Sequence, residues 1–460
     1  MNRLLTSLTN LAFTFVSSLL AFSTIANAQT PHWSVVPEHV SRDIEVFQQL
    51  FQDAATDGLG ITVLGDSQET TFAGAGRDYI SALNDEFFQQ YGNVPKTAFV
   101  PPSNFVHGWH LSSTDQGSIS TSDSTVLPGV RVSEISNSSN IQHGFLSHFS
   151  THGGLIDPTP EMSTSLFNGN EIEVELLAST RPGSSEISWR VNANNDQGRG
   201  FFGGTDLGTG TTNLGLDRAG LEYEIANLGT YDVGNFDHIQ VIAQGDSPTS
   251  SVDLLGARFV NASDTSGVSV QSFSRGGLRV MDFLNDFGDG ADLFDAVAGD
   301  DDIVALSYGA NDGRSRTADQ FKAELETLIE RIRIWTDNPD LPFVILGDPD
   351  NGLFTESARQ NFDLFPGVAA EIASEFDNVL ALNSRLLSSS IGWDIDNPNF
   401  NQFVLDDQIH YTPQGAIALA RLQVESLTNI SAVPEPSSLV VSSAVICCFL
   451  SRRRRRSHGR

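Results

Sequence analysis

The stretch "ITVLGDSQETTFAG", residues 61–74, places four apolar or β-branched residues directly before Gly65, Asp66 and Ser67. A short run of this kind, bounded by turn residues, is typical of a buried β-strand. Apolar residues at helical spacing follow and stop at Gly92, which predicts a helix after the turn. Because Gly, Asp and Ser are common turn residues, the stretch alone does not distinguish a turn serine from a nucleophile.

The same alternation of strand and helix returns in the second half of the chain. The predicted strands cover residues 302–309, 342–348 and 378–383, and the predicted helices cover residues 317–336, 358–376 and 412–427. Strands that alternate with helices of this length favour a parallel sheet covered on both faces. The sequence therefore predicts an α/β domain, to which the strand and helix of residues 61–92 also belong, since such a small unit hardly folds alone.

The region between these halves has a different texture. Short alternating runs such as "IEVELLAST" and "ISWRVNA" are separated by clusters of Gly, Asn, Asp and Thr. This pattern is typical of an antiparallel β-sandwich. We therefore expect one α/β domain in two parts, residues 29–100 and 263–430, interrupted by a β-rich module at residues 101–262.

The N-terminus has the composition of an export signal. Arg3 precedes an apolar stretch, and Ala26-Asn27-Ala28 forms an A-x-A cleavage site. Residues 1–28 are therefore predicted to be a secretory signal peptide.

The C-terminus combines Val433-Pro434-Glu435-Pro436, a short apolar segment over residues 439–450 and the arginines at 452–456. This order resembles the PEP-CTERM sorting signal of Gram-negative bacteria that make exopolysaccharide. The resemblance implies export to the periplasm, cell surface or extracellular matrix, transient membrane contact, and removal of residues 432–460 by a membrane protease. Because the apolar segment is shorter than the roughly 20 residues of a spanning helix, a poor C-terminal membrane anchor is the alternative.

Composition restricts the partners and the chemistry. The formal net charge is −31, and an acidic surface argues against nucleic acid and anionic lipid, which both need clustered Lys and Arg. The two cysteines, Cys447 and Cys448, lie in the C-terminal segment, so the body of the chain has no disulfide or thiolate chemistry.

Four polar stretches fall at predicted strand ends or in the loops beside them, where open parallel sheets bind ligands. They are Gly65-Asp66-Ser67, "SFSRGGLRV" at 272–280, "YGANDG" at 308–313 and "LDDQIHYTPQG" at 405–415. Together they supply a hydroxyl, backbone N–H groups, a side-chain amide, and an imidazole three residues after a carboxylate. These groups suffice for acyl transfer.

Each group has a chemical role in such a reaction. The Ser67 hydroxyl attacks the acyl carbon once His410 accepts its proton, and Asp407 orients the imidazole. The N–H groups of Ser67 and Gly276 and the amide of Asn311 are candidates to bind the oxyanion.

In order and spacing, the four blocks resemble the SGNH (GDSL) hydrolases. The resemblance maps the family's catalytic positions onto Ser67, Gly276, Asn311 and His410, with Asp407 as the acid. It implies a flavodoxin-like fold and no cofactor.

Two choices stay open beside this assignment. Gly277 is adjacent to Gly276, and the backbone N–H of either glycine could be the one that binds the oxyanion. Asp406 competes with Asp407, but the family's spacing favours Asp407, and we expect Asp406 to face solvent.

The layout around the module gives a closer likeness. "EFFQQYGNVPKTAFVPPSNF" at 86–105 and a β-rich segment before "VSVQSFSRGG" resemble peptidoglycan O-acetylesterases with a carbohydrate-binding-like module. The likeness implies removal of O-acetyl groups from a polysaccharide that the module helps to present. The alternatives are a surface polysaccharide-binding protein without turnover, and a lipase or thioesterase of the same family.

Other polar runs suggest no metal site. His143, His148 and His152 match no zinc pattern, and residues 285–302 and 347–352 lack the ligand order of an EF-hand. We expect the two acidic runs to form a solvated surface.

Overall fold

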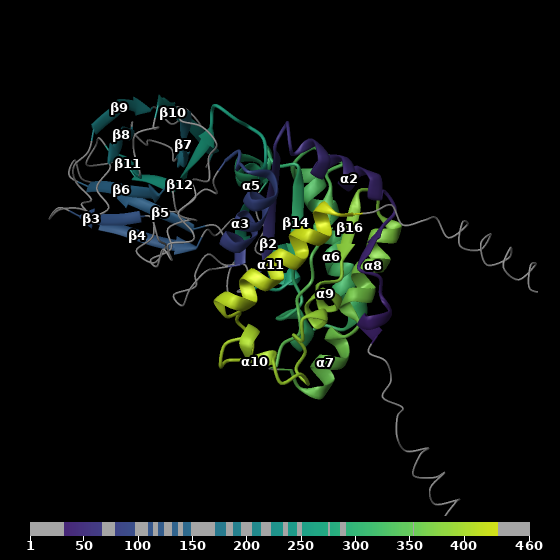
Figure 1. Ribbon diagram of the computed structural model, residues 1–460. Helices are drawn as coiled ribbons and strands as arrows, with labels where there is room; N and C mark the ends of the chain where they lie inside the picture. Colours follow the sequence, from purple (N-terminus) through teal and green to yellow (C-terminus); the bar gives the residue numbers. More distant parts are fainter. Residues whose placement is uncertain are drawn as a thin grey trace, which may run out of the picture.

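The computed structural model has an α/β part and a group of antiparallel strands beside it (Figure 1). The structure describes residues 32–66, 79–96, 109–113, 118–123, 131–136, 141–148, 171–180, 187–194, 205–212, 222–232, 238–245, 251–274, 277–285, 291–352 and 354–430. Both terminal segments with the predicted export and sorting signals lie outside these residues.

The α/β part is built on a six-stranded sheet in the order β1-β16-β15-β14-β2-β13. Its strands are β1 (His39–Ser41), β2 (Leu59–Gly65), β13 (Val268–Ser274), β14 (Ile303–Ser307), β15 (Phe343–Ile345) and β16 (Val379–Leu382). All pairs are parallel except that of β1 with β16, so the sheet is mixed and the prediction of a parallel sheet is wrong at this edge. Without β1, the order follows the flavodoxin-like 2-1-3-4-5 pattern, with its switch point between β2 and β14.

Helices cover both faces of this sheet. They are α2 (Ile44–Asp53), α3 (Tyr79–Tyr91), α4 (Val280–Asn285), α5 (Ala291–Ala298), α6 (Ala318–Trp335), α7 (Glu356–Phe362), α8 (Phe365–Glu375), α9 (Ser384–Ser390), α10 (Phe400–Phe403) and α11 (Pro413–Thr428). Val304 and Leu306 of β14 pack into one core with α6 and α8, whereas Ile303 and Ala305 pack into another with α2, α3 and α11. Side chains alternate between the faces of a strand, and both sides here are apolar because both are covered.

The helix predicted over residues 358–376 is two helices. The first, α7, ends at Phe362, and α8 starts at Phe365 with Pro366 in its first turn. Proline lacks an N–H and is tolerated only at a helix start, so the second helix begins there. The other predicted helices and strands agree with the structure to within a few residues.

Between α3 and β13 the chain forms two antiparallel five-stranded sheets, in the orders β10-β7-β12-β5-β4 and β3-β6-β11-β8-β9. The strands are β3 (Trp109–Ser113), β4 (Ser118–Asp123), β5 (Arg131–Ser136), β6 (Ile141–His148), β7 (Glu171–Thr180), β8 (Ile187–Asn194), β9 (Thr205–Thr212), β10 (Glu222–Asp232), β11 (His238–Gly245) and β12 (Ser251–Asn261). Leu177 of β7 is buried in the core formed with α6 and α8, so the sheet that contains β7 contacts the α/β part directly.

Among the described helices, none combines the length and the apolar character that a membrane span requires.

Candidate active site

The switch point of the sheet brings two of the predicted blocks together. β2 is buried along its whole length and is followed by Asp66, whose side chain is fully buried. Its neighbour β14 is followed by the turn that carries Asn311. The predicted nucleophile Ser67 is the next residue after Asp66 and lies outside the described residues.

Asn311 is anchored at this point by its side-chain amide. The Nδ2 atom donates to Asp66 Oδ2 at 2.8 Å and to the backbone oxygen of Leu278 at 3.3 Å. Leu278 belongs to the loop after β13, which also carries the predicted oxyanion donor Gly276. Gly276 lies outside the described residues. The adjacent Gly277 has a φ of +81°, and no atom of the described residues lies within 4 Å of its Cβ position. The amide of Asn311 therefore ties the ends of β2, β13 and β14 together.

His410 and Asp407 form the predicted pair in the loop between α10 and α11. His410 Nδ1 lies 2.6 Å from Asp407 Oδ2, and the other carboxylate oxygen accepts the N–H groups of Ile409 and His410. Burial raises the pKa of Asp407, but the hydrogen bonds from His410 and the two backbone N–H groups outweigh it and lower that pKa. A carboxylate fixed on Nδ1 leaves Nε2 as the base. Asp406 is exposed, as expected.

The backbone of this loop is closed on itself. Leu405 N–H donates to the oxygen of His410 at 2.7 Å, and Val404 bridges to Tyr411. Gln408, between Asp407 and His410, has a φ of +61°, a conformation unusual for a residue other than glycine. This conformation turns the chain so that residues 407 and 410 meet.

The loop leads directly into α11. The Thr412 hydroxyl caps the helix by accepting the N–H of Gly415 at 3.0 Å. A Cβ atom at Gly415 would lie only 2.0 Å from the backbone oxygen of Phe403, the last residue of α10. The close approach of the two helices fixes both ends of the loop.

Buried carboxyl groups surround the turn with Asn311. Asp348 Oδ2 accepts the N–H of Ala310 at 2.5 Å, and Asp312 Oδ1 accepts the N–H of Val280 at 3.3 Å. Burial, with Glu324 and Asp348 nearby, raises the pKa of Asp312 to about 8. Burial and the neighbouring Asp66 raise the pKa of Asp348 well above its ordinary value. Both groups therefore keep a proton in conditions where a solvated aspartate loses it.

The prediction of a solvated acidic surface is wrong at several of these positions. Asp348, Asp350 and Asn351, in the 347–352 run, are buried, and so is Asp301 at the end of the 285–302 run. Sequence reasoning missed these groups because an aspartate's burial depends on distant partners. Asp350 is paired with Arg359 and Arg385, and Asp301 with Lys96.

Among the residues that the structure describes, no three His, Cys, Asp or Glu side chains are placed to hold a metal ion. Of the three histidines considered in the sequence analysis, His152 lies outside the described residues, and the side chains of His143 and His148 are not described.

No protein-family model and no curated protein matches the chain. Among solved structures, one described as a peptidoglycan O-acetylesterase in action matches with a TM-score of 0.53 and 15% identity, over 87% of this chain and 96% of its own. A family two carbohydrate esterase from Clostridium thermocellum matches with a TM-score of 0.27 and 10% identity, over 65% of this chain and 97% of its own. One from Cellvibrio japonicus has a TM-score of 0.23 and 11% identity, over 70% of this chain and 98% of its own. The first likeness shows a common fold.

Proposed function

We propose that the chain is an exported serine esterase of the SGNH type that removes O-acetyl or other short acyl groups from a polysaccharide. The observation that carries the proposal is the His410–Asp407 contact of 2.6 Å in the loop before α11. That loop is held to the carboxyl end of β15 by a hydrogen bond from Gly352 N–H to Gln408 O. We infer that the loop lies near the carboxyl ends of the strands, where Asp66 and Asn311 meet.

In the first half of the reaction, Ser67 Oγ attacks the carbonyl carbon of the ester. Its proton passes to His410 Nε2, which is free to accept it because Nδ1 is turned toward Asp407. The carbonyl oxygen becomes an oxyanion, stabilised by the N–H groups of Ser67 and Gly276 and by the amide of Asn311. To bind it, Asn311 exchanges its longer hydrogen bond, of 3.3 Å to Leu278 O, for the oxyanion and keeps the bond to Asp66. When the intermediate collapses, the carbon–oxygen bond to the sugar breaks, and the sugar oxygen takes the proton from His410.

The second half of the reaction releases the acid. Water loses a proton to His410 and attacks the acyl-Ser67 carbonyl, and the same donors bind the second oxyanion. Collapse breaks the bond to Ser67 Oγ, which recovers its proton from His410. Throughout, the Asp407 carboxylate stabilises the imidazolium, and its lowered pKa keeps it ionised for this role.

The polysaccharide and the site of action are part of the same proposal. The fold of a peptidoglycan O-acetylesterase over nearly the whole chain supports a polymeric acetyl ester as substrate. We infer that the two five-stranded sheets form one β-sandwich module that presents the polymer. We also infer that residues 1–28 direct export and that residues 432–460 are a PEP-CTERM signal removed by a sorting protease.

The test is ester hydrolysis by the purified protein and by Ser67→Ala. We expect the wild type to release acetate from p-nitrophenyl acetate and from acetylated xylan or peptidoglycan. A fluorophosphonate probe, which reacts with activated serines, is expected to label the wild type and not the variant. Ser374→Ala is the matched control, since this exposed serine bonds only to a helix backbone oxygen in the described structure.

Other outcomes separate the alternatives. A folded wild type that binds acetylated polysaccharide but is neither active nor labelled is a binding protein. Faster hydrolysis of long acyl chains or of thioesters than of acetyl esters identifies a lipase or a thioesterase.

A further inference from the structure

The loop with Asp407 and His410 is exposed, and its position depends on a neighbouring segment. The two side chains are 45% and 43% exposed, so burial does not hold them in place. The segment after β15 does contact the loop: Gly352 N–H donates to Gln408 O at 2.9 Å. A Cβ atom at Gly352 would lie 2.8 Å from the Cβ of Gln408, so only glycine allows this approach.

A second contact joins the same segment to the other end of the loop. The indole N–H of Trp393 donates to the backbone oxygen of Asp350 at 3.1 Å. The buried Trp393 ring packs edge-on against Tyr411, next to His410, with ring centroids 5.1 Å apart. Residues 350–352 thus contact the loop directly at Gln408, between the two residues of the pair, and through Trp393 at Tyr411, after the pair.

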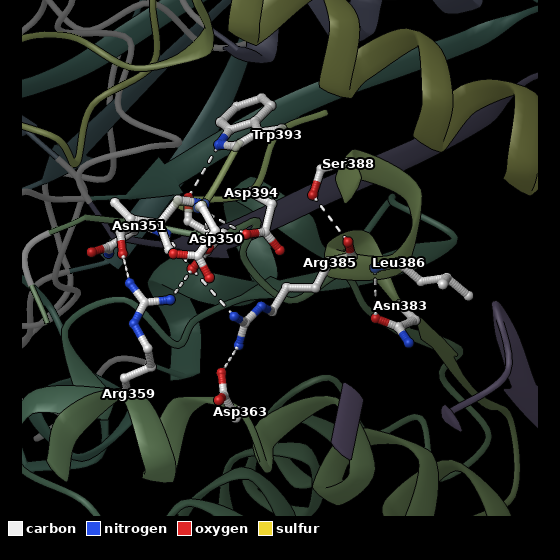
Figure 2. A network of polar contacts seen from close by, with 12 residues as sticks. Asp350, Asn351, Arg359, Asp363, Asn383, Arg385, Leu386, Ser388, Trp393 and Asp394 are labelled. Atoms are coloured by element: carbon white, nitrogen blue, oxygen red, sulfur yellow. Dashed lines mark hydrogen bonds and ion pairs between the residues drawn. The ribbon is translucent and has the colours of Figure 1, made fainter. Parts of the chain in front are cut away.

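This segment is itself fixed by the carboxylate of Asp350, which is 4% exposed (Figure 2). Oδ1 accepts from Arg359 Nη1 at 2.7 Å and from Arg385 Nη2 at 3.2 Å, and Oδ2 accepts the N–H of Ile395 at 2.9 Å. Arg359 also donates to the backbone oxygen of Asn351 at 2.7 Å.

Arg385 is held from several directions. It is 3% exposed, pairs with Asp363 as well as Asp350, and lies 4.8 Å from the ring centre of Phe362. The charges of the two arginines, Arg359 and Arg385, balance those of the two aspartates, Asp350 and Asp363. Buried ion pairs add little net stability but fix geometry well, so this network suits positioning.

We propose that Asp350 is a positioning residue that holds the Asp407–His410 pair in its productive geometry through Gly352 and Trp393. The proposal rests on the proposed function and adds a residue that touches neither the substrate nor the reacting atoms. In Asp350→Asn the amide cannot accept from all of its present donors, and residues 350–352 shift. Because small displacements of catalytic groups are costly, we expect kcat to fall about tenfold to a hundredfold with KM unchanged.

The matched control is Asp301→Asn. Asp301 is equally buried and accepts from Lys96 at 2.6 Å and from Gln271 at 2.6 Å. It precedes β14, however, and so lies at the amino-terminal end of the strand, away from the site at the carboxyl ends. We expect this variant to lower the thermal midpoint and to leave kcat unchanged. Equal losses of kcat in both variants, or wild-type kcat in folded Asp350→Asn, overturn the proposal.

A second variant covers the case in which Asp350→Asn does not fold. Gly352→Ala is expected to reduce kcat because its methyl group displaces Gln408. Adding Gln408→Gly is expected to restore kcat by removing the three side-chain atoms that the methyl group meets. A loss that Gln408→Gly does not relieve contradicts the positioning role.

A readout independent of catalysis separates this proposal from the proposed function. The imidazole ¹⁵N shifts of neutral His410 are expected to show the Nδ1–H tautomer in the wild type and a mixture in Asp350→Asn and Gly352→Ala. If wild type and Ser67→Ala are equally inactive, the esterase proposal fails, and the tautomer still decides the role of Asp350. Unchanged tautomers in both variants overturn that role.

Discussion

The side-chain amide of Asn311 donates to the carboxylate of Asp66 over 2.8 Å, and Asp66 is the residue directly before Ser67. The predicted oxyanion donor is thus held by the neighbour of the predicted nucleophile. The two residues come from the ends of adjacent strands, β2 and β14, so the register of the sheet sets the distance between them. The aspartate of the Gly-Asp-Ser turn therefore also holds the side chain of Asn311, in addition to favouring the turn.

This contact predicts a coupled loss of activity. Asn311→Ala is expected to lower kcat about 10²–10³-fold, as removal of an oxyanion donor does. Asp66→Asn is expected to lower kcat less, because the amide of Asn311 remains but loses its charged acceptor. Since Asp66 acts through Asn311, the double variant is expected to be no slower than Asn311→Ala, measured as kcat on an acetyl ester. Additive losses contradict the coupling.

A second prediction concerns the acid of the pair. Asp407→Asn is expected to lower kcat by at least about a hundredfold and up to about 10⁴-fold, because the tautomer of His410 is no longer fixed. Asp406→Asn, at the exposed neighbouring position, is the matched control and is expected to keep wild-type kcat. The reverse ranking of the two variants assigns the acid to Asp406.

The pH dependence of the same pair has a defined sign. The folded-state pKa of Asp407 is lowered, so its favourable contacts are present above the ordinary pKa of 3.8 and are lost as pH falls through the lower folded value. We therefore expect the kcat/KM profile to show no second step near pH 4 from the Asp407 carboxyl. Rate profiles between pH 3 and 9 measure this, and a second step near pH 4 contradicts it.

Asp312 predicts the opposite dependence for stability. Its pKa is raised from 3.8 to about 8, so its contribution to stability is full below about pH 3.8 and is lost as pH rises to about 8. We expect wild-type stability to fall over this range, with a smaller slope in Asp312→Asn, where no charge develops. In this variant stability still depends on pH, because the pKa values of Asp348 and Glu324 are also raised. Urea unfolding at a series of pH values measures the difference, and equal slopes contradict it.

The junction of α10 and α11 predicts a steric effect. Gly415→Ala is expected to lower the free energy of unfolding by about 1–3 kcal/mol or more, because its methyl group meets the backbone of Phe403. Gly367→Ala in α8 is the control, since the three atoms nearest to that methyl group all belong to the imidazole of the exposed His32. There alanine's helix propensity is expected to offset the contact. Thermal unfolding of both variants measures this, and equal midpoints contradict the distinction.

Sequence patterns predicted the elements around the site well because local rules control them. The buried runs of β2 and β14 and the capped helix α6 follow from apolar periodicity and from the Thr317 cap. The His410–Asp407 contact was predictable because both residues belong to one short loop. The break at Pro366 was missed, because the apolar pattern over residues 358–376 was interpreted as one helix although proline marks a helix start.

The remainder depends on partners distant in sequence. Nothing near Asp350 indicates that Arg385 will pair with it, and Asp66 reads as a turn residue until Asn311 is brought to it across the sheet. The edge strand β1 has three residues, too few for a periodic signal, and it is held by pairing with β16. Such features follow from tertiary structure and not from local pattern.

The position of β2 has a consequence for how the chain folds. Its neighbours in the sheet come much later in the sequence, and Ser269 contacts the backbone of Leu59 from 210 positions away. The intervening β-rich region brings its own ends together, since Asn93 donates to Asp264 and Asn261 donates to Asn93. If that region folds first, the loop left to close shrinks from about two hundred residues to about thirty, which lowers the entropic cost of closure by about 1–2 kcal/mol. The order in which the two parts fold then governs how long the apolar strand β2 stays unpaired and open to aggregation.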